Sequence, residues 1–168
     1  MRKVVLNLAQ SLDGHICRLD GSVDFLGDTS EENPKLFSKF IKTVDIVIMG
    51  RTTFDEYDIY GWDYLEGKKI IVLSSRPGNS DRVEFINSNI KELVESLQGV
   101  IWCFGGTSII KSFLENDLVD EFYITTVPSI IGRGKRLFEL GDYEYKLKLF
   151  DSEIKEKFIT HIYTRQEG

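Results

Sequence analysis

Three apolar runs that each end in small, hydroxyl or basic residues most constrain the fold of this chain. They read Ile-Val-Ile-Met-Gly-Arg-Thr-Thr at 46–53, Lys-Ile-Ile-Val-Leu-Ser-Ser-Arg at 69–76 and Ile-Trp-Cys-Phe-Gly-Gly-Thr-Ser at 101–108. Continuous apolar runs of this length are typical of parallel strands that are buried on both faces of a sheet. In such sheets the carboxyl ends of the strands meet at one edge, where ligands bind. We therefore expect this edge to present groups that suit phosphates.

The segments around these runs alternate between strand and helix patterns. Apolar periodicity predicts strands at residues 3–9, 45–50, 69–73, 82–86, 100–104 and 119–127, and helices at 34–42, 89–97 and 107–116. Pro34 suits the first turn of a helix, and Asn89 is a favoured N-cap residue. Residues 143–150 and 157–164 alternate in polarity, which predicts a terminal antiparallel hairpin with its turn at 151–153. The expected fold class is therefore α/β, with a mixed and mostly parallel central sheet.

Length and charge exclude several classes of protein. The 168 residues, 42% of them apolar, suffice for one sizeable core, so we expect a single domain over residues 1–168. The net charge of −6 disfavours nucleic acid and anionic membranes as partners. The N-terminal apolar segment is too short for a signal peptide, and no run reaches the roughly 18 apolar residues of a membrane span, which favours a cytoplasmic location. Two cysteines and two histidines offer no disulfide framework and no recognisable metal site.

The paired glycines at 105 and 106 mark a candidate pyrophosphate site. They close a predicted strand and open a predicted helix, so main-chain N–H groups and the positive end of the helix dipole can approach an anion. Thr107 or Ser108 is expected to cap this helix. An ordinary strand-to-helix turn explains the glycines about as well, and the segment is not the dinucleotide fingerprint G-x-G-x-x-G.

Two further strand ends carry arginines and hydroxyls. Gly50, Arg51 and Thr52 follow one predicted strand, and Arg76 follows two serines at the end of another. Arginine suits phosphates because its donors form a rigid fork. A helix capped by Thr52 with a solvated arginine, and a turn at residues 75–78, are the plainer interpretations. The coincidence of three such strand ends in one small chain favours a binding site.

These segments resemble the dihydrofolate reductase superfamily. The resemblance rests on residues 47–54, 67–78, 81–83, 104–106 and 119–125, which occur in the family's order and cover most of the chain. Ser-Leu-Asp-Gly at 11–14 and Pro-Ser-Ile-Ile-Gly-Arg-Gly at 128–134 resemble one branch, the reductase domain of riboflavin biosynthesis and its small stand-alone relatives. The resemblance implies a three-layer sandwich of the dihydrofolate reductase type.

The resemblance also implies NADPH as the cofactor. It assigns the cofactor phosphates to Gly50, Arg51 and Thr52, the 2′-phosphate and adenosine to Ser74, Ser75 and Arg76, and the pyrophosphate to Gly105, Gly106, Thr107 and Ser108. Main-chain groups of Ala9 and Ile16 would orient the nicotinamide carboxamide. The charge argument agrees, because a doubly charged 2′-phosphate on an acidic protein needs nearby arginines.

Substrate contacts are expected from Asn7, Asp13 and Asp24. Asp13 follows the first strand where the resemblance places a substrate-facing aspartate, although Asp-Gly is also a common tight turn. Asp24 is equally compatible with a solvated loop. Folate reductases carry a carboxylate on the first helix, and residues 35–41 contain none, which demotes dihydrofolate. Glu31 and Glu32 lie just before that helix, where acids favour the helix dipole.

The predicted function is an NADPH-dependent reductase that transfers hydride to a C=N or carbonyl group of a small pyrimidine- or pteridine-related substrate. The resemblance points most closely to 5-amino-6-(5-phosphoribosylamino)uracil reductase. The alternatives are a dihydrofolate reductase and a non-catalytic nucleotide-binding protein. The resemblance further implies a homodimer, with the late strands or the region of Ile130 and Ile131 at the interface. The aromatic-rich segment 54–64 is expected to cover the cofactor, to mediate association or to pack on its own core.

Overall fold

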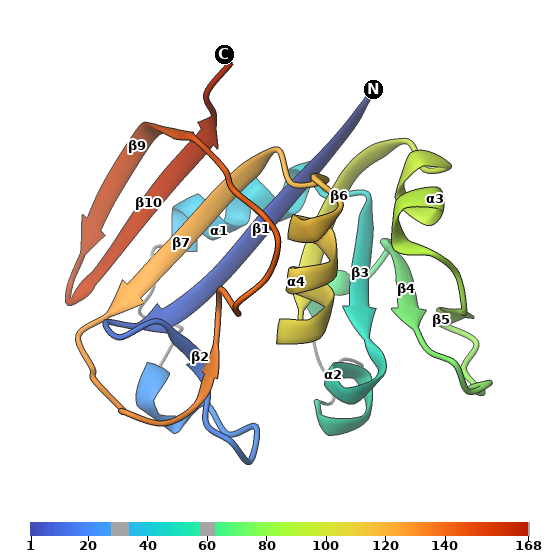
Figure 1. Ribbon diagram of the computed structural model, residues 1–168, viewed down its shortest axis with the longest axis horizontal. Helices are drawn as coiled ribbons and strands as arrows, with labels where there is room; N and C mark the ends of the chain where they lie inside the picture. The colour runs from blue at the N-terminus through green and yellow to red at the C-terminus, as the bar shows by residue number, and fades with distance from the viewer. Residues whose placement is uncertain (28–33, 58–62, 168) are drawn as a thin grey trace.

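One eight-stranded sheet organises the protein. The computed structural model describes residues 1–27, 34–57 and 63–167 (Figure 1). The strand order is β5-β4-β3-β6-β1-β7-β10-β9. Neighbouring strands are parallel from β5 to β7, and β10 is antiparallel to both β7 and β9, so the predicted mixed and mostly parallel sheet is confirmed. The strands are β1 (Arg2–Ser11), β3 (Ile46–Gly50), β4 (Lys69–Leu73), β5 (Val83–Ile86), β6 (Gly99–Gly105), β7 (Glu121–Val127), β9 (Leu147–Lys155) and β10 (Phe158–Arg165).

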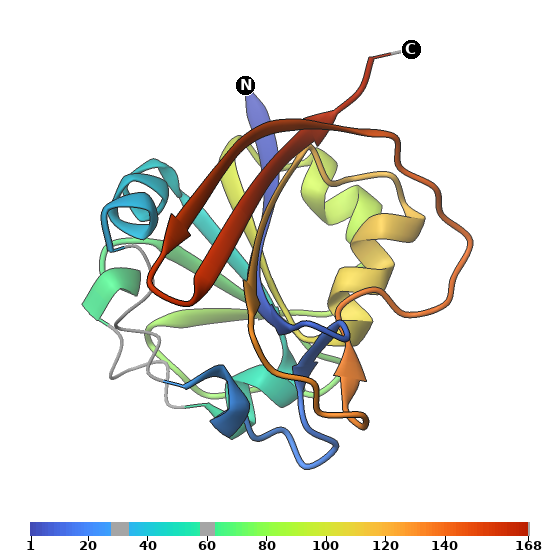
Figure 2. The same cartoon turned by 90° about the vertical axis from the view of Figure 1, so that its left-hand side faces the viewer.

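Helices cover both faces of this sheet and complete the predicted three-layer sandwich. Helix α1 (Pro34–Thr43) lies on one face, and α3 (Ile90–Glu95) and α4 (Thr107–Glu115) lie on the other (Figures 1 and 2). Phe40 of α1 is buried with Val5 and Trp102 on the first face. Phe113 of α4 belongs to the core of the opposite face. Continuous apolar strands are required here because each sheet face meets a helix layer.

Short elements gather at the carboxyl ends of the central strands. They are β2 (His15–Cys17), η1 (Asp24–Leu26), α2 (Arg51–Glu56) and β8 (Lys135–Arg136). The short helix η4 (Asp63–Leu65) lies elsewhere, beside α1, where the centre of the Tyr64 ring is 5.3 Å from that of the Phe37 ring. Strands β2 and β8 form a separate antiparallel pair below the carboxyl end of β1, to the left of α4 (Figure 1). The sequence did not predict this pair, because three- and two-residue strands are too short to show a period. His15 is therefore buried in a strand.

The predicted turn of the terminal hairpin was wrong. Residues 151–153 lie inside β9, and the chain reverses at Glu156, which has a φ of 53°. Asp, Ser and Glu are turn-forming residues, but β9 is an edge strand whose polar side chains remain in solvent. Polar composition at this position therefore did not require a turn.

The central strands separate where the candidate site forms. Pairing of β1 with β6 ends at Leu6 opposite Cys103, whereas pairing of β1 with β7 continues to Ser11 opposite Val127. The register between β6 and β3 also shifts after Ile48. The carboxyl halves of β1 and β6 are therefore free to line an opening. None of the described helices is long and apolar enough to cross a membrane.

Candidate functional site

A pocket of about 720 Å³ opens at the carboxyl ends of β1, β3, β4 and β6. Its walls come from these strand ends, from β2, and from the starts of α2 and α4. The structure brings together the residues that the sequence assigned to a cofactor, apart from Gly105, which precedes the lining residue Gly106. The predicted residues in the lining are Ala9, Ile16, Gly50, Arg51, Thr52, Ser74, Ser75, Arg76, Gly106, Thr107 and Ser108.

Two helices begin in this pocket without a side-chain cap. Gly50 is the N-cap residue of α2 and Gly106 is that of α4, so the predicted caps by Thr52, Thr107 or Ser108 are not formed. The first N–H groups of a helix have no partner within the helix, and they attract anions together with the helix dipole. These two N-termini therefore supply uncommitted donors and partial positive charge to one space.

Glycine at both N-caps allows the two helix starts to approach one another. A Cβ atom on Gly50 would lie 2.9 Å from Cγ1 of Ile109, and one on Gly106 would lie 3.4 Å from Oγ1 of Thr53. The first distance is shorter than van der Waals contact permits. A larger residue in place of Gly50 or Gly106 would thus push α2 and α4 apart or fill the space between the two helix starts.

Arg51 is held firmly by the protein itself. Its Nε atom donates to Oδ1 of Asp55 at 3.0 Å, and its Nη1 atom donates to Oγ of Ser74 at 3.2 Å. Nη1 also lies within hydrogen-bonding distance of the carbonyl oxygens of Arg76 and Pro77. Arg51 was expected to bind a phosphate through its fork of donors. The geometry commits most of this fork to protein acceptors, although Arg51 still lines the pocket.

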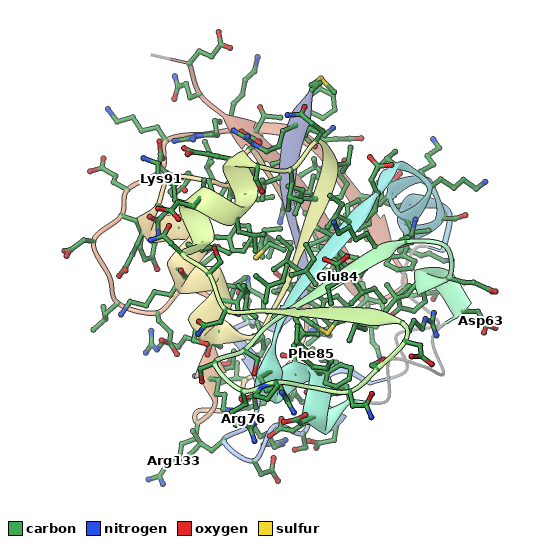
Figure 3. The ribbon with its side chains drawn as sticks, turned by 90° about the vertical axis from the view of Figure 1, so that its right-hand side faces the viewer. Asp63, Arg76, Glu84, Phe85, Lys91 and Arg133 are labelled. Atoms are coloured by element: carbon green, nitrogen blue, oxygen red, sulfur yellow. The ribbon has the colours of Figure 1, made fainter. Side chains whose placement is uncertain are left out.

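Ser74, Ser75 and Arg76 form the turn after β4. The Ser74 hydroxyl donates to the Arg76 carbonyl at 2.9 Å and accepts from the Arg76 N–H at 3.1 Å, so it stabilises the turn. Ser75 is exposed in the pocket wall. The Arg76 guanidinium is also exposed, and Figure 3 views this edge of the molecule with Arg76 and Phe85 labelled. This segment therefore forms a turn, as the plainer interpretation expected, and also lines the pocket.

The other end of the pocket is mainly apolar and was largely missed by sequence reasoning. Its unpredicted lining residues have no shared motif, and only the fold brings them together. They include Leu8, Cys17, Val23 and Leu26. Lys135, Glu56 and Tyr57 also line this end, and the last two belong to the segment 54–64 that was expected to cover the cofactor, to mediate association or to pack on its own core.

Helix α2 pins the loop that precedes η1 over this end. The Tyr57 hydroxyl donates to the Gly21 carbonyl at 2.7 Å, and the Glu56 carboxylate packs against Gly21 so closely that a Cβ there would lie 2.7 Å from it. Burial raises the pKa of Tyr57 and of the Cys17 thiol. Lys135 lowers and Glu56 raises the Cys17 pKa to smaller extents. Cys17 is therefore protonated at neutral pH.

None of the three predicted substrate residues lies in the pocket lining. The carbonyl of Asn7 accepts a hydrogen bond from Nε1 of Trp102 at 3.2 Å inside the sheet. Asp24 pairs with Arg18 at 2.7 Å, and this contact lowers the Asp24 pKa. Its neighbours Val23 and Leu26 line the pocket in its place.

Asp13 links two segments that are distant in the chain. It accepts from the Ser11 hydroxyl at 2.6 Å and from the N–H groups of Gly132 at 2.8 Å and Ile131 at 3.3 Å. Nδ1 of His15 lies 3.3 Å from its Oδ2 atom. The Ser11 bond, together with the two main-chain donors, holds the Asp13 pKa well below its usual range, against a weaker opposing effect of desolvation. The tight turn expected at Asp13 and Gly14 is present, closed by the Gly14 N–H to the Ser11 carbonyl at 3.0 Å. The Asp13 carboxylate in addition fastens the segment before β8 to this turn.

The RibD C-terminal domain family matches residues 2–158. The chain belongs to the RibD C-terminal domain family. This RibD C-terminal domain protein is 35% identical over 155 residues to the uncharacterized protein YwjB of Bacillus subtilis (strain 168), with 88% of this chain and 89% of YwjB covered.

Two solved structures share the fold. A putative riboflavin biosynthesis protein from Shewanella sp. PV-4 has a TM-score of 0.85 and 26% identity, and 98% of this chain and 99% of that one are covered. Dihydrofolate reductase from Enterococcus faecalis, solved with NADP(H) and RAB-propyl, has a TM-score of 0.70 and 21% identity, with 98% and 97% covered. The predicted superfamily, branch and dihydrofolate reductase-like fold are confirmed.

Replacing Asp13 by Asn should lower the thermal midpoint by several degrees at neutral pH, because an amide cannot accept as many bonds as the carboxylate. A carboxylate with a depressed pKa stabilises the folded state above its unfolded pKa of about 3.9 and loses this effect as pH falls through the folded pKa. The difference between wild type and variant should therefore be complete at pH 6–7 and shrink below about pH 4. Differential scanning calorimetry from pH 3 to 7 measures this.

Asp142→Asn is the matched control, since it removes the same charge from an exposed residue. A thermal difference for Asp13→Asn that is independent of pH would contradict the assigned role.

Proposed function

We propose that this protein is an NADPH-dependent reductase that transfers hydride to a C=N or C=O carbon of a small pyrimidine- or pteridine-related substrate. The observation that carries the proposal is that two uncapped helix N-termini, Arg51 and Arg76 all line the same pocket. We call this pocket, which runs along the carboxyl ends of the strands, the groove. The related enzyme of Enterococcus faecalis binds NADP(H), and the Shewanella relative is described as a putative riboflavin biosynthesis protein. Among known activities, 5-amino-6-(5-phosphoribosylamino)uracil reductase is the closest in kind.

The groove offers a separate environment to each part of the dinucleotide. The N-terminus of α4 at Gly106 would receive the pyrophosphate through main-chain N–H groups. Ser75 and Arg76 would meet the 2′-phosphate. Main-chain groups of Ala9 and Ile16, where β1 has left β6, would orient the nicotinamide carboxamide.

The apolar end of the pocket suits hydride transfer. The bound cofactor would supply a hydride to the electrophilic carbon, while the electron pair of the C=N or C=O bond takes up a proton. Leu8, Val23 and Leu26 give this end an apolar wall, and Tyr57 fixes the covering loop through Gly21. Exclusion of water and close positioning are the main protein contributions to such a reaction.

Dihydrofolate is the second candidate substrate. Helix α1 (Pro34–Thr43) contains no Asp or Glu, whereas folate reductases carry a carboxylate at the corresponding helix. Glu31 and Glu32 lie outside the described residues. We therefore rank dihydrofolate below the pyrimidine intermediate.

A direct assay separates these activities. We expect NADPH oxidation at 340 nm to be faster with 5-amino-6-(5-phosphoribosylamino)uracil than with dihydrofolate at equal concentrations. Robust turnover of dihydrofolate would reverse the ranking. Tight NADPH binding without turnover of either compound would support the non-catalytic alternative.

Cofactor preference is expected to depend on Arg76. NADPH should bind more tightly than NADH, and Arg76→Ala should reduce this preference about tenfold, because hydrogen bonds to charged groups contribute about 1.5–3 kcal/mol. Titration of tryptophan fluorescence with both cofactors measures the two dissociation constants. Lys91→Ala removes a cation from α3, which Figure 3 shows well away from Arg76, and should leave the preference unchanged. Equal affinity of the wild type for both cofactors would refute NADPH dependence.

We further propose a homodimer that forms along β9. This edge strand carries Leu149, Phe150 and Ile154 exposed to solvent, and Ile159 of β10 extends the apolar surface. An unpaired strand edge with exposed apolar residues is suited to pairing with a second copy. Ile130, at the other predicted interface, is also exposed but lies in a loop.

Phe150→Lys should convert a dimeric mass to a monomeric one in size-exclusion chromatography with light scattering, because it places a charge on the apolar edge. Ile130→Lys is the matched comparison and should leave the mass unchanged. Dissociation by Ile130→Lys alone would move the interface to the 128–134 segment, and a monomeric wild type would exclude the dimer.

A further inference from the structure

Asp55 lies between the two arginines of the groove. Its Oδ1 and Oδ2 atoms accept from Nε of Arg51 at 3.0 and 3.2 Å, and Oδ2 also lies 3.3 Å from Nη2 of Arg76. Both arginines line the pocket, whereas Asp55 does not. One carboxylate outside the pocket lining therefore compensates both cations.

The contact of Asp55 with Arg51 belongs to a rigid framework. The Arg51 side chain is 22% exposed, and its guanidinium carbon lies 5.0 Å from the centre of the Phe85 ring. Phe85 packs so closely on Gly78 that a Cβ atom there would lie 2.3 Å from the ring. With the Nη1 bonds to the turn after β4, Arg51 is held on several sides. A ligand would have to break several contacts to move it.

The contact of Asp55 with Arg76 is much weaker. The Arg76 side chain is 67% exposed, and among the residues that the structure describes one Nη2 to Oδ2 contact holds its guanidinium. Exposed ion pairs of this kind contribute little to stability. Arg76 can therefore exchange Asp55 for another anion at small cost, whereas Arg51 cannot.

We propose that Asp55 is the residue that sets anion selectivity in this groove. It holds the Arg51 side chain in place, and it releases Arg76 when a phosphomonoester binds, here the 2′-phosphate of the dinucleotide. The three side chains carry a net charge of +1 with Asp55 and +2 without it. The carboxylate thus weakens the attraction for a dianion and repels it directly. This inference rests on the proposed function, because it concerns the same dinucleotide.

Asp55→Asn tests the inference, because the amide oxygen can still accept from Arg51 while the charge is removed. Repulsion between one and two charges about 6 Å apart in water corresponds to about a tenfold change in a binding constant before salt screening. We expect Asp55→Asn to bind NADPH about three- to tenfold more tightly at low ionic strength. Affinity for NADH should not change, and the gain for NADPH should shrink in 0.5 M salt.

A double-mutant cycle shows whether Asp55 acts through Arg76. In an Arg76→Gln background, Asp55→Asn should change NADPH affinity much less than in the wild type, since the released cation is absent. A purely structural effect of Asp55 would change the binding of both cofactors in either background. Asp63→Asn, which removes a charge that Figure 3 shows well away from Arg76, is the control and should leave both affinities unchanged. Thermal midpoints confirm that each variant is folded.

The outcomes separate the inference from the function on which it rests. An unchanged or weakened NADPH affinity in folded Asp55→Asn, beside a wild type that prefers NADPH, overturns the role of Asp55 and leaves the reductase proposal intact. A wild type that binds neither cofactor overturns both. Tighter NADPH binding that disappears with Arg76→Gln supports the inference.

Discussion

The groove depends on the uncommitted N–H groups at the starts of α2 and α4. Each helix has a glycine as its N-cap residue and no side-chain cap. Each starts at the carboxyl end of one of the adjacent strands β3 and β6. The fold creates this arrangement because parallel strands followed by helices place every helix N-terminus at the same edge. Local positive potential from main-chain groups then exists on a protein whose net charge is −6. Arg51 and Arg76 add to a field that the backbone already sets up.

Sequence patterns predicted the strands and helices that are long enough to show a regular pattern of apolar residues. The central strands and the polar residues at their carboxyl ends were predicted because continuous apolar runs and their polar ends indicate buried parallel strands. The three layers and the positions of Ala9 and Ile16 were implied only by the family resemblance. Strands β2 and β8 were missed because they are too short to have a period. The pocket residues Leu8, Cys17, Val23 and Leu26 were missed for a different reason: they share no motif, and only the loop attachment through Gly21 and the pairing of β2 with β8 bring them together.

The contacts of the arginines and aspartates show that sequence spacing does not identify the partners of a charged side chain. Spacing placed Arg51 at a strand end but gave no sign that Asp55, four residues later, takes its Nε donor. Asp13 likewise has a motif compatible with a turn or a substrate contact, and main-chain donors more than 100 residues away join Ser11 in fixing its carboxylate. A charged residue is used by whichever partners the tertiary structure brings within hydrogen-bonding distance. Residue type and position alone therefore identify candidates for a site without assigning their roles.

The two ends of the pocket impose opposite physical conditions on a ligand. At one end, helix N-termini and arginines favour anions in a setting open to solvent, where salt and competing carboxylates modulate the attraction. At the other end, mainly apolar walls and a loop held by Tyr57 favour uncharged groups. A ligand that spans the pocket must therefore be charged at one end and largely uncharged at the other. A phosphorylated dinucleotide with a dihydronicotinamide ring has this polarity, whereas a uniformly charged nucleotide would lose hydration at the apolar end without finding compensating partners.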